Sequence, residues 1–287
     1  ADQFPPLPNA WWLFPKGRSV VPFELGPLFE SHSMAAVDGL VSLISDREQF
    51  AKVAADPNSI VSVGSHYHGG RGALLLANHY PDRMLGVSAD SGWIKHSEPR
   101  SDNFVHPMIS GIIEWDSVLQ EISHTTSNFA TVPFFVGSGQ GDSAGYPWRM
   151  FYQQTLLSKY NVEAKVDSSI GLSYKRQPTA VITPTKDVLE FVVKRVGRPQ
   201  YLRKTFTVSS WHPAIYHGRG GVHISALNIP TQLATIDVKI QGNLWMLNTT
   251  NTRSSELLGM FTIYLYYKAN RTTNRVEIYS SCFTDLN

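Results

Sequence analysis

Short apolar strands alternate with amphipathic helices along residues 31–196 of this 287-residue chain, and this alternation constrains its fold more than any other feature. Apolar runs of strand length are followed by segments in which apolar residues recur at helical spacing. The expected strands span 59–64, 84–88, 132–137 and 161–166, and the expected helices span 33–44, 50–53, 71–80, 109–119, 147–160 and 185–196. Such alternation is typical of a parallel sheet with helices on both faces, so we expect an α/β core.

Two segments of different character flank that core. Residues 1–30 are rich in proline and aromatic residues, which indicates an extended arm that lies on a surface. After the core, short alternating strands replace the helices, and Gly242-Asn243 between two of them indicates a hairpin. We therefore expect three parts: the arm, an α/β core over 31–199 and a small, sandwich-like all-β domain over 200–287.

Composition excludes several classes of protein. Hydrophobic residues make up 42% of the chain and charged residues 17%, which is enough apolar material for a core. The formal net charge is only +2, with no run of lysine and arginine, so nucleic-acid binding is not expected. The single cysteine, Cys282, excludes an internal disulfide. No apolar stretch reaches about 18 residues, so no membrane span is expected.

The first residue, Ala1, is not an initiator methionine. This start is compatible with a cleaved leader, and hence with secretion or an organelle, and equally with a truncated chain. The sequons that begin at Asn248 and Asn270 are glycosylation acceptors if the chain is secreted. Because two sequons in a chain of this length are close to chance, they leave the compartment unassigned.

The segment from Ile60 to Ala77 combines a strand, a tight turn, a glycine pair and a helix. That context is typical of a nucleophile elbow, in which a strained turn lifts one side chain above the sheet. Because the backbone crowds there, the residues two before and two after the apex have to be small. Tyr67 meets this condition, with Ser65 before it and Gly69 after it. Ser65 does not, because Val63 and Tyr67 occupy those places, so we expect Tyr67 at the apex.

At this point the chain resembles the α/β-hydrolase superfamily, most closely its prolyl-oligopeptidase-like branch of esterases and peptidases. The segments that carry the resemblance are Gly69-Gly70-Arg71-Gly72-Ala73-Leu74, Tyr80-Pro81-Asp82-Arg83, Ser91-Gly92-Trp93-Ile94-Lys95, the strand at 132–137, Asp142 and Pro147. The resemblance covers roughly residues 31–250. It implies a hydrolase-like parallel sheet, and large members of this branch carry a β-rich domain that would match residues 200–287.

Departures from the family's pattern argue against catalysis. Active members have serine at the apex, whereas a tyrosine phenol, with a pKa of about 10, is a poor acyl acceptor. The family's acid corresponds to Asp142, but its histidine, expected around residues 168–180, has no counterpart. Indeed no histidine lies between His124 and His212. The apex residue and the base of the triad are therefore both missing.

A third part of the machinery is missing upstream of the elbow. Residues 1–58 lack the glycine-rich loop that supplies the oxyanion hole. An ordinary hydrolase also has several strands before its elbow, and these residues leave room for about one. We therefore expect an abridged hydrolase-like sheet, or the C-terminal part of a longer precursor.

The sequence thus predicts a catalytically inactive hydrolase-like protein. It would be a structural or interaction subunit of a larger protein assembly, docked through the arm and the open sheet edge. The alternative is an active serine esterase or peptidase that uses Ser65, with His66 or His68 as its base, or that a partner chain completes. A third interpretation is a carbohydrate- or ligand-binding module with Tyr67 and the Trp93 region as its floor. We expect no cofactor.

Several residues have competing interpretations. His66 and His68 could ligate a metal ion together with His32 or His96, but no carboxylate or cysteine stands at a metal-binding spacing, so we expect no metal site. Asp142 is either a residual acid or, as we favour, a cap of the following helix. Three histidines form a loose cluster in the β-rich part: His212, His217 and His223. We expect them to be ordinary strand and turn residues rather than metal ligands.

Overall fold

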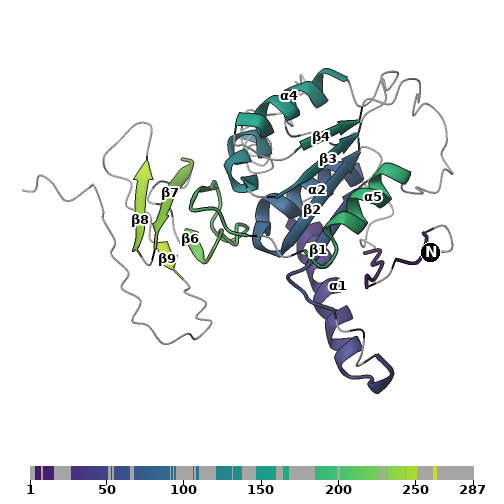
Figure 1. Cartoon of the computed structure of the whole chain (residues 1–287). Coiled ribbons are helices and arrows are strands. Elements are labelled where there is room, and N and C mark those ends of the chain that lie inside the picture. The colour runs from purple at the N-terminus through teal and green to yellow at the C-terminus, as the bar shows by residue number, and fades with distance from the viewer. Residues whose placement is uncertain are drawn as a thin grey trace, which may run out of the picture.

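The structure, a computed structural model, describes most of the core and part of each flanking segment. The described residues are 4–7, 9–15, 27–50, 53, 55–64, 68–90, 92, 94, 106, 108–109, 121–130, 132–137, 147–159, 164–167, 185–198, 201–224, 227, 229, 232–242, 244–250 and 261–263. They form two lobes, which we call the α/β lobe (27–198) and the β-rich lobe (201–263) (Figure 1).

A parallel sheet forms the centre of the α/β lobe. Its strands, in spatial order, are β1 (Ile60–Gly64), β2 (Met84–Asp90), β3 (Phe134–Gly137) and β4 (Ala164–Asp167). All three strand pairings are parallel, as the sequence predicted. Because parallel neighbours require crossover connections, the carboxyl ends of all four strands lie along one edge of the sheet.

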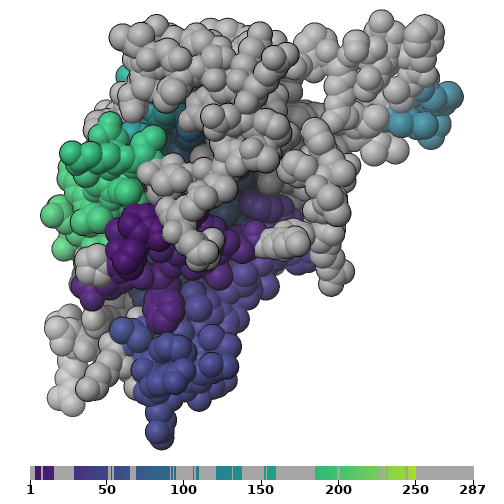
Figure 2. Space-filling model, turned by 90° about the vertical axis from the view of Figure 1, so that its right-hand side faces the viewer, coloured from purple at the N-terminus to yellow at the C-terminus, as the bar shows by residue number. Residues whose placement is uncertain are grey.

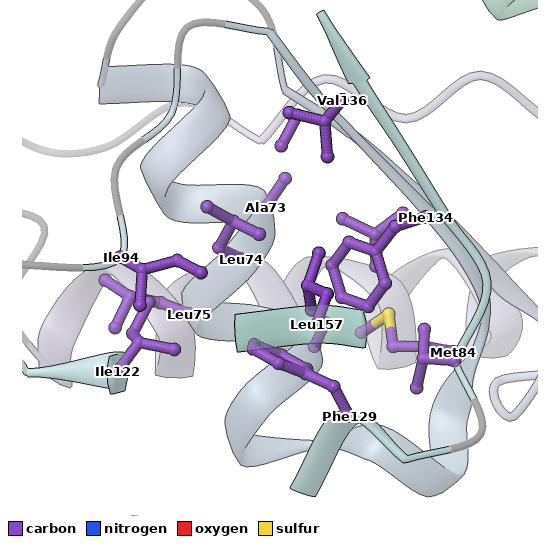
Figure 3. Close-up of a cluster of buried hydrophobic side chains, with 14 residues drawn as sticks. Ala73, Leu74, Leu75, Met84, Ile94, Ile122, Phe129, Phe134, Val136 and Leu157 are labelled. Carbon is purple, nitrogen blue, oxygen red and sulfur yellow. The ribbon is translucent and has the colours of Figure 1, made fainter. Parts of the chain in front are cut away.

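Helices cover both faces of this sheet. α2 (His68–His79) and α4 (Pro147–Lys159) enclose the main core on one face, whose centre includes Leu74, Phe134 and Leu157 (Figure 3). On the other face, α5 (Lys186–Arg195) packs on a smaller cluster: Phe135, Val188, Phe191 and Val192, with Val61 and Val63 at its side. The side chains of β3 thus alternate between the two clusters, as expected for a sheet buried on both faces.

The first helix begins earlier than the sequence suggested. α1 runs over Pro27–Ser45, so the expected start near Ser33 is wrong. Residues 27–30, which we had included in the extended arm, are helical. Proline is well tolerated in the first helical turn, because its missing N–H would have no partner there and its φ is already helical. At this position Pro27 marks a helix start rather than a break.

Other expected boundaries differ by smaller amounts. α2 begins at His68 rather than Arg71 and ends before Pro81, as predicted. A 3₁₀ turn, η1, runs over Glu48–Phe50, and residues 51 and 52 of the helix expected at 50–53 lie outside the described residues. Thr185 caps α5 as a helix-start residue should, since its Oγ1 accepts a hydrogen bond from the Val188 N–H at 3.4 Å. Most of the helical patch expected at 109–119 lies outside the described residues.

The described part of the N-terminal arm lies against its own chain (Figure 2). Leu7 packs on the α5 cluster. The Trp11 indole donates a hydrogen bond to the Val53 carbonyl at 3.1 Å, and its ring meets Phe50 edge-on. Trp11 remains 44% exposed and Phe14 50% exposed. Docking of this arm on another protein stays a prediction.

The β-rich lobe contains two antiparallel sheets. The first sheet contains, in spatial order, β5 (Thr205–Ser210), β7 (Ala234–Gln241) and β8 (Leu244–Thr250). The second sheet pairs β6 (Val222–Ile224) with β9 (Phe261–Ile263). The predicted hairpin is confirmed, and Gly242 in its turn has φ of 60°. Both sheets contribute to one apolar core: Phe206, Val208, Val222, Ile224, Ile236, Val238 and Leu247. The strand expected at 276–279 lies outside the described residues, and the sandwich stays a prediction.

Candidate functional site

The turn between β1 and α2 is enclosed by glycine backbone. A Cβ added to Gly64 would lie 1.9 Å from the Gly69 carbonyl oxygen. A Cβ on Gly70 would lie 2.4 Å from the Asp90 oxygen, and one on Gly92 would lie 2.7 Å from the Gly70 carbonyl carbon. The end of β1, the start of α2 and the segment after β2 therefore meet backbone to backbone. A nucleophile elbow requires such a close crossing of strand and helix.

The residues predicted to carry chemistry at this turn lie inside a short connection. Gly64 ends β1 and His68 opens α2, so the turn consists of residues 65–67. Ser65, His66 and Tyr67 lie outside the described residues. The apex position of Tyr67, and the alternative use of Ser65 with His66 or His68, therefore stay predictions.

Other predicted site residues belong to connections at the same edge of the sheet. Asp142 falls between the end of β3 and the start of α4, which is a carboxyl-end connection like the elbow, and it lies outside the described residues. Trp93 and His96, after β2, also lie outside them. His32 is on α1. Among the residues that the structure describes, no three histidine, cysteine, aspartate or glutamate side chains gather as metal ligands would.

A carboxylate at this edge was missed by the sequence analysis. Asp90 is the last residue of β2, in register with Gly137 of β3, and its Oδ1 lies 3.1 Å from where a Cβ on Gly137 would be. The expected strand ended at residue 88, two residues short of it. The available signal was that an acidic residue directly follows an uninterrupted buried run, because such residues mark the carboxyl ends of parallel strands.

A buried polar network lies away from the elbow, where the two lobes meet. Asn78 of α2 donates to Thr125 Oγ1 at 2.8 Å and accepts from the Tyr216 hydroxyl at 3.0 Å and from Asn128 Nδ2 at 3.1 Å. Asn128 also donates to the Ser209 carbonyl at 2.9 Å and accepts from the Ser209 N–H at 2.8 Å. All five residues are buried. Polar side chains buried with this many partners fix the position of one lobe on the other.

Two further buried groups extend this network. Glu30 of α1 and Nδ1 of His79, at the end of α2, form an ion pair or hydrogen bond inside the protein. The His79 ring meets the Tyr216 ring edge-on, with 4.5 Å between the ring centroids. Burial raises the pKa of the Tyr216 phenol far above its usual range, so the phenol stays protonated and donates its hydrogen bond at any physiological pH.

The turn over residues 80–83, one of the segments that carried the family resemblance, also binds the β-rich lobe. Tyr80 stacks on His217 with ring centroids 4.3 Å apart and an interplanar angle of 21°. Asp82 Oδ2 accepts a hydrogen bond from the Gly220 N–H at 2.6 Å, and its Oδ1 lies 3.4 Å from Nη1 of the buried Arg219. We call the contact between residues 78–83 and 216–220, together with the Asn78 network, the seam.

Sequence reasoning did not find the seam. The sequence predicts His217 as a strand or turn residue rather than a metal ligand, and it gives no role to His79. Its pairs join residues as far apart as Asn78 and Tyr216, and no periodicity relates residues at such a separation. The only available signal was the cluster of polar and aromatic side chains at the end of α2, where an amphipathic helix would normally reach solvent.

Known proteins resemble this chain only distantly in sequence. No protein-family model matches it. An uncharacterized secreted protein of Arthroderma benhamiae is 23% identical over a 259-residue alignment, which covers 86% of this chain and 27% of the relative. The chain therefore spans about a quarter of the length of that relative.

Solved structures similar to the chain include SOBER1 of Arabidopsis thaliana and two esterases. SOBER1 is 19% identical, with a TM-score of 0.31 over 62% of this chain and 70% of its own. Esterase Est22 is 17% identical, with a TM-score of 0.37 over 53% and 49%, and esterase PE8 is 17% identical, with a TM-score of 0.32 over 58% and 61%. These TM-scores are too low to assign a fold or a function to this chain.

Proposed function

We propose that this chain is a catalytically inactive relative of the α/β hydrolases, close to their prolyl-oligopeptidase-like branch, and that it serves as a structural or interaction part of a larger protein assembly. One observation carries this proposal. The connection between β4, which ends at Asp167, and α5, which begins at Lys186, contains no histidine. In the family that the sequence resembles, the catalytic base comes from the connection before the last core helix.

The chemistry of the elbow supports the same conclusion. The backbone crossing of Gly64, Gly69 and Gly70 supports a hydrolase-type turn at residues 65–67. Without a base, a serine hydroxyl in that turn keeps its proton and does not attack an ester or amide. The Tyr67 phenol is bulkier and, with a pKa of about 10, is protonated at neutral pH. Neither residue is equipped to form an acyl-enzyme.

The role in a larger assembly is supported by the edge of the sheet. Among the described strands, β1 lies at the end of the order, and its Val61 and Val63 side chains contribute to the α5 cluster. The unpaired backbone groups of such an edge favour addition of another strand. The Arthroderma benhamiae relative is much longer than this chain. We propose that a further part of such a polypeptide, or a partner subunit, covers the β1 edge.

A secreted location fits this proposal. The relative is described as secreted, and Asn248, the first residue of a glycosylation sequon, is exposed on β8. Among the described residues, no helix is both long enough and apolar enough to cross a membrane.

A fluorophosphonate probe tests the absence of catalysis, because it labels activated serines whatever their substrate. We expect no labelling of the wild-type chain, of Ser65→Ala or of Tyr67→Ser, because all three lack a base. An active serine hydrolase in the same experiment serves as the positive control. Labelling of the wild type that Ser65→Ala abolishes would instead establish the alternative, an active esterase or peptidase. Labelling gained by Tyr67→Ser would reveal a base elsewhere and would also overturn the proposal.

A further inference from the structure

His217 occupies the centre of the seam. Its ring stacks on Tyr80 of the α/β lobe, and its backbone N–H donates to the His79 carbonyl at 3.1 Å. Although the ring is covered by Tyr80, the residue as a whole is exposed to solvent. A single residue thus contacts the other lobe through both its ring and its main chain, and protons reach it from solution.

Charged and titratable groups surround His217 from every element packed against it. They are Glu30 and Asp38 on α1, His79, Tyr80, Asp82 and Arg83 at the end of α2 and in the turn that follows, Tyr216 and Arg219 on its own segment, and His223 on β6. The three carboxylates and two arginines of this group carry a formal net charge of −1. A proton on His217 adds a positive charge to this group next to Arg83.

These surroundings lower the pKa of His217 from its usual value. Partial burial is the main cause, and His223, His79 and Arg83 lower the pKa further, whereas Glu30 raises it. Stacking on the Tyr80 ring favours the protonated form and acts against these effects. When the lobes separate, the His217 ring becomes more solvated and His79, Arg83 and Glu30 move away, whereas His223 stays in the same lobe. The pKa of the His217 imidazole therefore rises towards its usual value of about 6.5.

The sign of the pH dependence follows from this difference. Above a pH of about 6.5 the ring is neutral in both the docked and the separated state, and docking is unaffected. As the pH falls below that value, the separated state binds the proton first, so docking weakens progressively. We propose that the seam is a pH-sensitive contact that loosens the β-rich lobe from the α/β lobe when His217 becomes protonated. This inference does not depend on whether the chain is catalytic.

Hydrogen exchange on the full chain tests the proposal. The N–H groups of Ser209, His217 and Gly220 each bond across the seam, so their protection from exchange reports docking directly. After correction for the intrinsic pH dependence of exchange, we expect these three amides to lose protection between about pH 7 and pH 5, the range in which histidine titrates. The amides of β2 and β3 should stay protected, which distinguishes separation of the lobes from global unfolding.

Two substitutions identify the residue responsible. His217→Gln removes the titrating group, so we expect the protection of the seam amides to become independent of pH in this range. The matched control is His212→Gln, because His212 is exposed and bonds through its backbone: its N–H donates to Ser210 Oγ at 3.1 Å and its carbonyl accepts from the Ile215 N–H at 3.0 Å. That variant should keep the full pH dependence of the wild type.

The proposal is overturned if the wild-type seam amides stay protected at pH 5, or if His217→Gln loses protection as the wild type does. His217→Phe provides a second uncharged variant that retains a ring against Tyr80. It should also be independent of pH, and a wild-type response from it would likewise contradict the assignment.

Discussion

At the scale of single residues, Asn78 makes three side-chain hydrogen bonds in the seam network, as many as Asn128 does. It satisfies two donors from other segments, the Tyr216 hydroxyl and Asn128 Nδ2, and it finds its own acceptor in Thr125. All of these groups are buried away from water. Because a buried donor without an acceptor costs more free energy than an intact hydrogen bond contributes, a network of this kind tolerates little change.

We therefore expect Asn78→Ala to be strongly destabilising. The substitution leaves the Tyr216 hydroxyl and one Asn128 N–H without their acceptor, at about 1–3 kcal/mol for each unsatisfied group. Urea unfolding followed by circular dichroism measures the loss. Asn58→Ala, at an exposed position, should stay within about 0.5 kcal/mol of the wild type. Equal stability of the two variants would show that the network contributes nothing.

A second prediction at this scale concerns Asn248, which is exposed on β8 opposite Asp237. If the chain passes through the secretory pathway, its sequon should carry a glycan. Expression with a leader in eukaryotic cells should then give a mass that falls on treatment with an N-glycosidase, and Asn248→Gln should lose that part of the shift. A chain that is secreted with an unmodified Asn248 would contradict this prediction.

At the scale of elements, the close crossing of β1 and α2 depends on the lack of side chains. Gly70 is buried, and a Cβ there would collide with the main chain of Asp90 and Gly92 at 2.4 to 2.9 Å. Gly39, in the middle of α1, has nothing within 4 Å of an added Cβ. An added Cβ therefore meets backbone atoms at Gly70 and open space at Gly39.

Alanine substitutions at these glycines should therefore have opposite effects. Gly39→Ala should raise the free energy of unfolding by up to about 1 kcal/mol, the difference in helix propensity. Gly70→Ala should lower it by more than that gain, because backbone atoms rather than flexible side chains have to move. Chemical denaturation of both variants compares them. A stabilising Gly70→Ala would mean that α2 does not cross β1 as closely as described.

Sequence reasoning succeeded where one local pattern decides the structure. Thr185 before an amphipathic run located α5, and Gly242-Asn243 between alternating strands located the β7–β8 hairpin. It failed where contacts with other segments of the chain decide the structure. Pro27 was taken as part of the arm, although its context makes it a helix start. The pairing of His79 with Glu30 depends on how α1 docks on α2, which neither segment encodes alone.

At the scale of the whole molecule, the seam makes two lobes with separate apolar cores behave as one unit. The main core of the α/β lobe and the core of the β-rich lobe share no residue. What joins them is mostly polar: the Asn78 network, the ring stack on His217 and the contacts of Asp82. Hydrogen bonds and charges depend on geometry and pH more steeply than apolar burial does, so this junction is the part of the molecule most open to regulation.

Substitution of Asp82 tests the coupling between the two lobes most directly, because Asp82 contacts the β-rich lobe through both carboxylate oxygens. Asp82→Ala removes the carboxylate that lies 3.4 Å from the guanidinium of Arg219, which is 2% exposed, and it removes the acceptor of the Gly220 N–H. Removing a carboxylate beside a buried positive charge is destabilising. Calorimetry of the wild type should therefore show one cooperative transition, and Asp82→Ala should show two, with the β-rich lobe melting first.

The control for this experiment is Asp46→Ala, which removes an exposed carboxylate at the end of α1 and should leave the single transition unchanged. The lower of the two transitions in Asp82→Ala is identified by the loss of protection of β7 amides while those of β2 persist. A single unshifted transition in Asp82→Ala would mean that the lobes are coupled without this carboxylate. Separate transitions already present in the wild type would mean that the seam does not couple them at all.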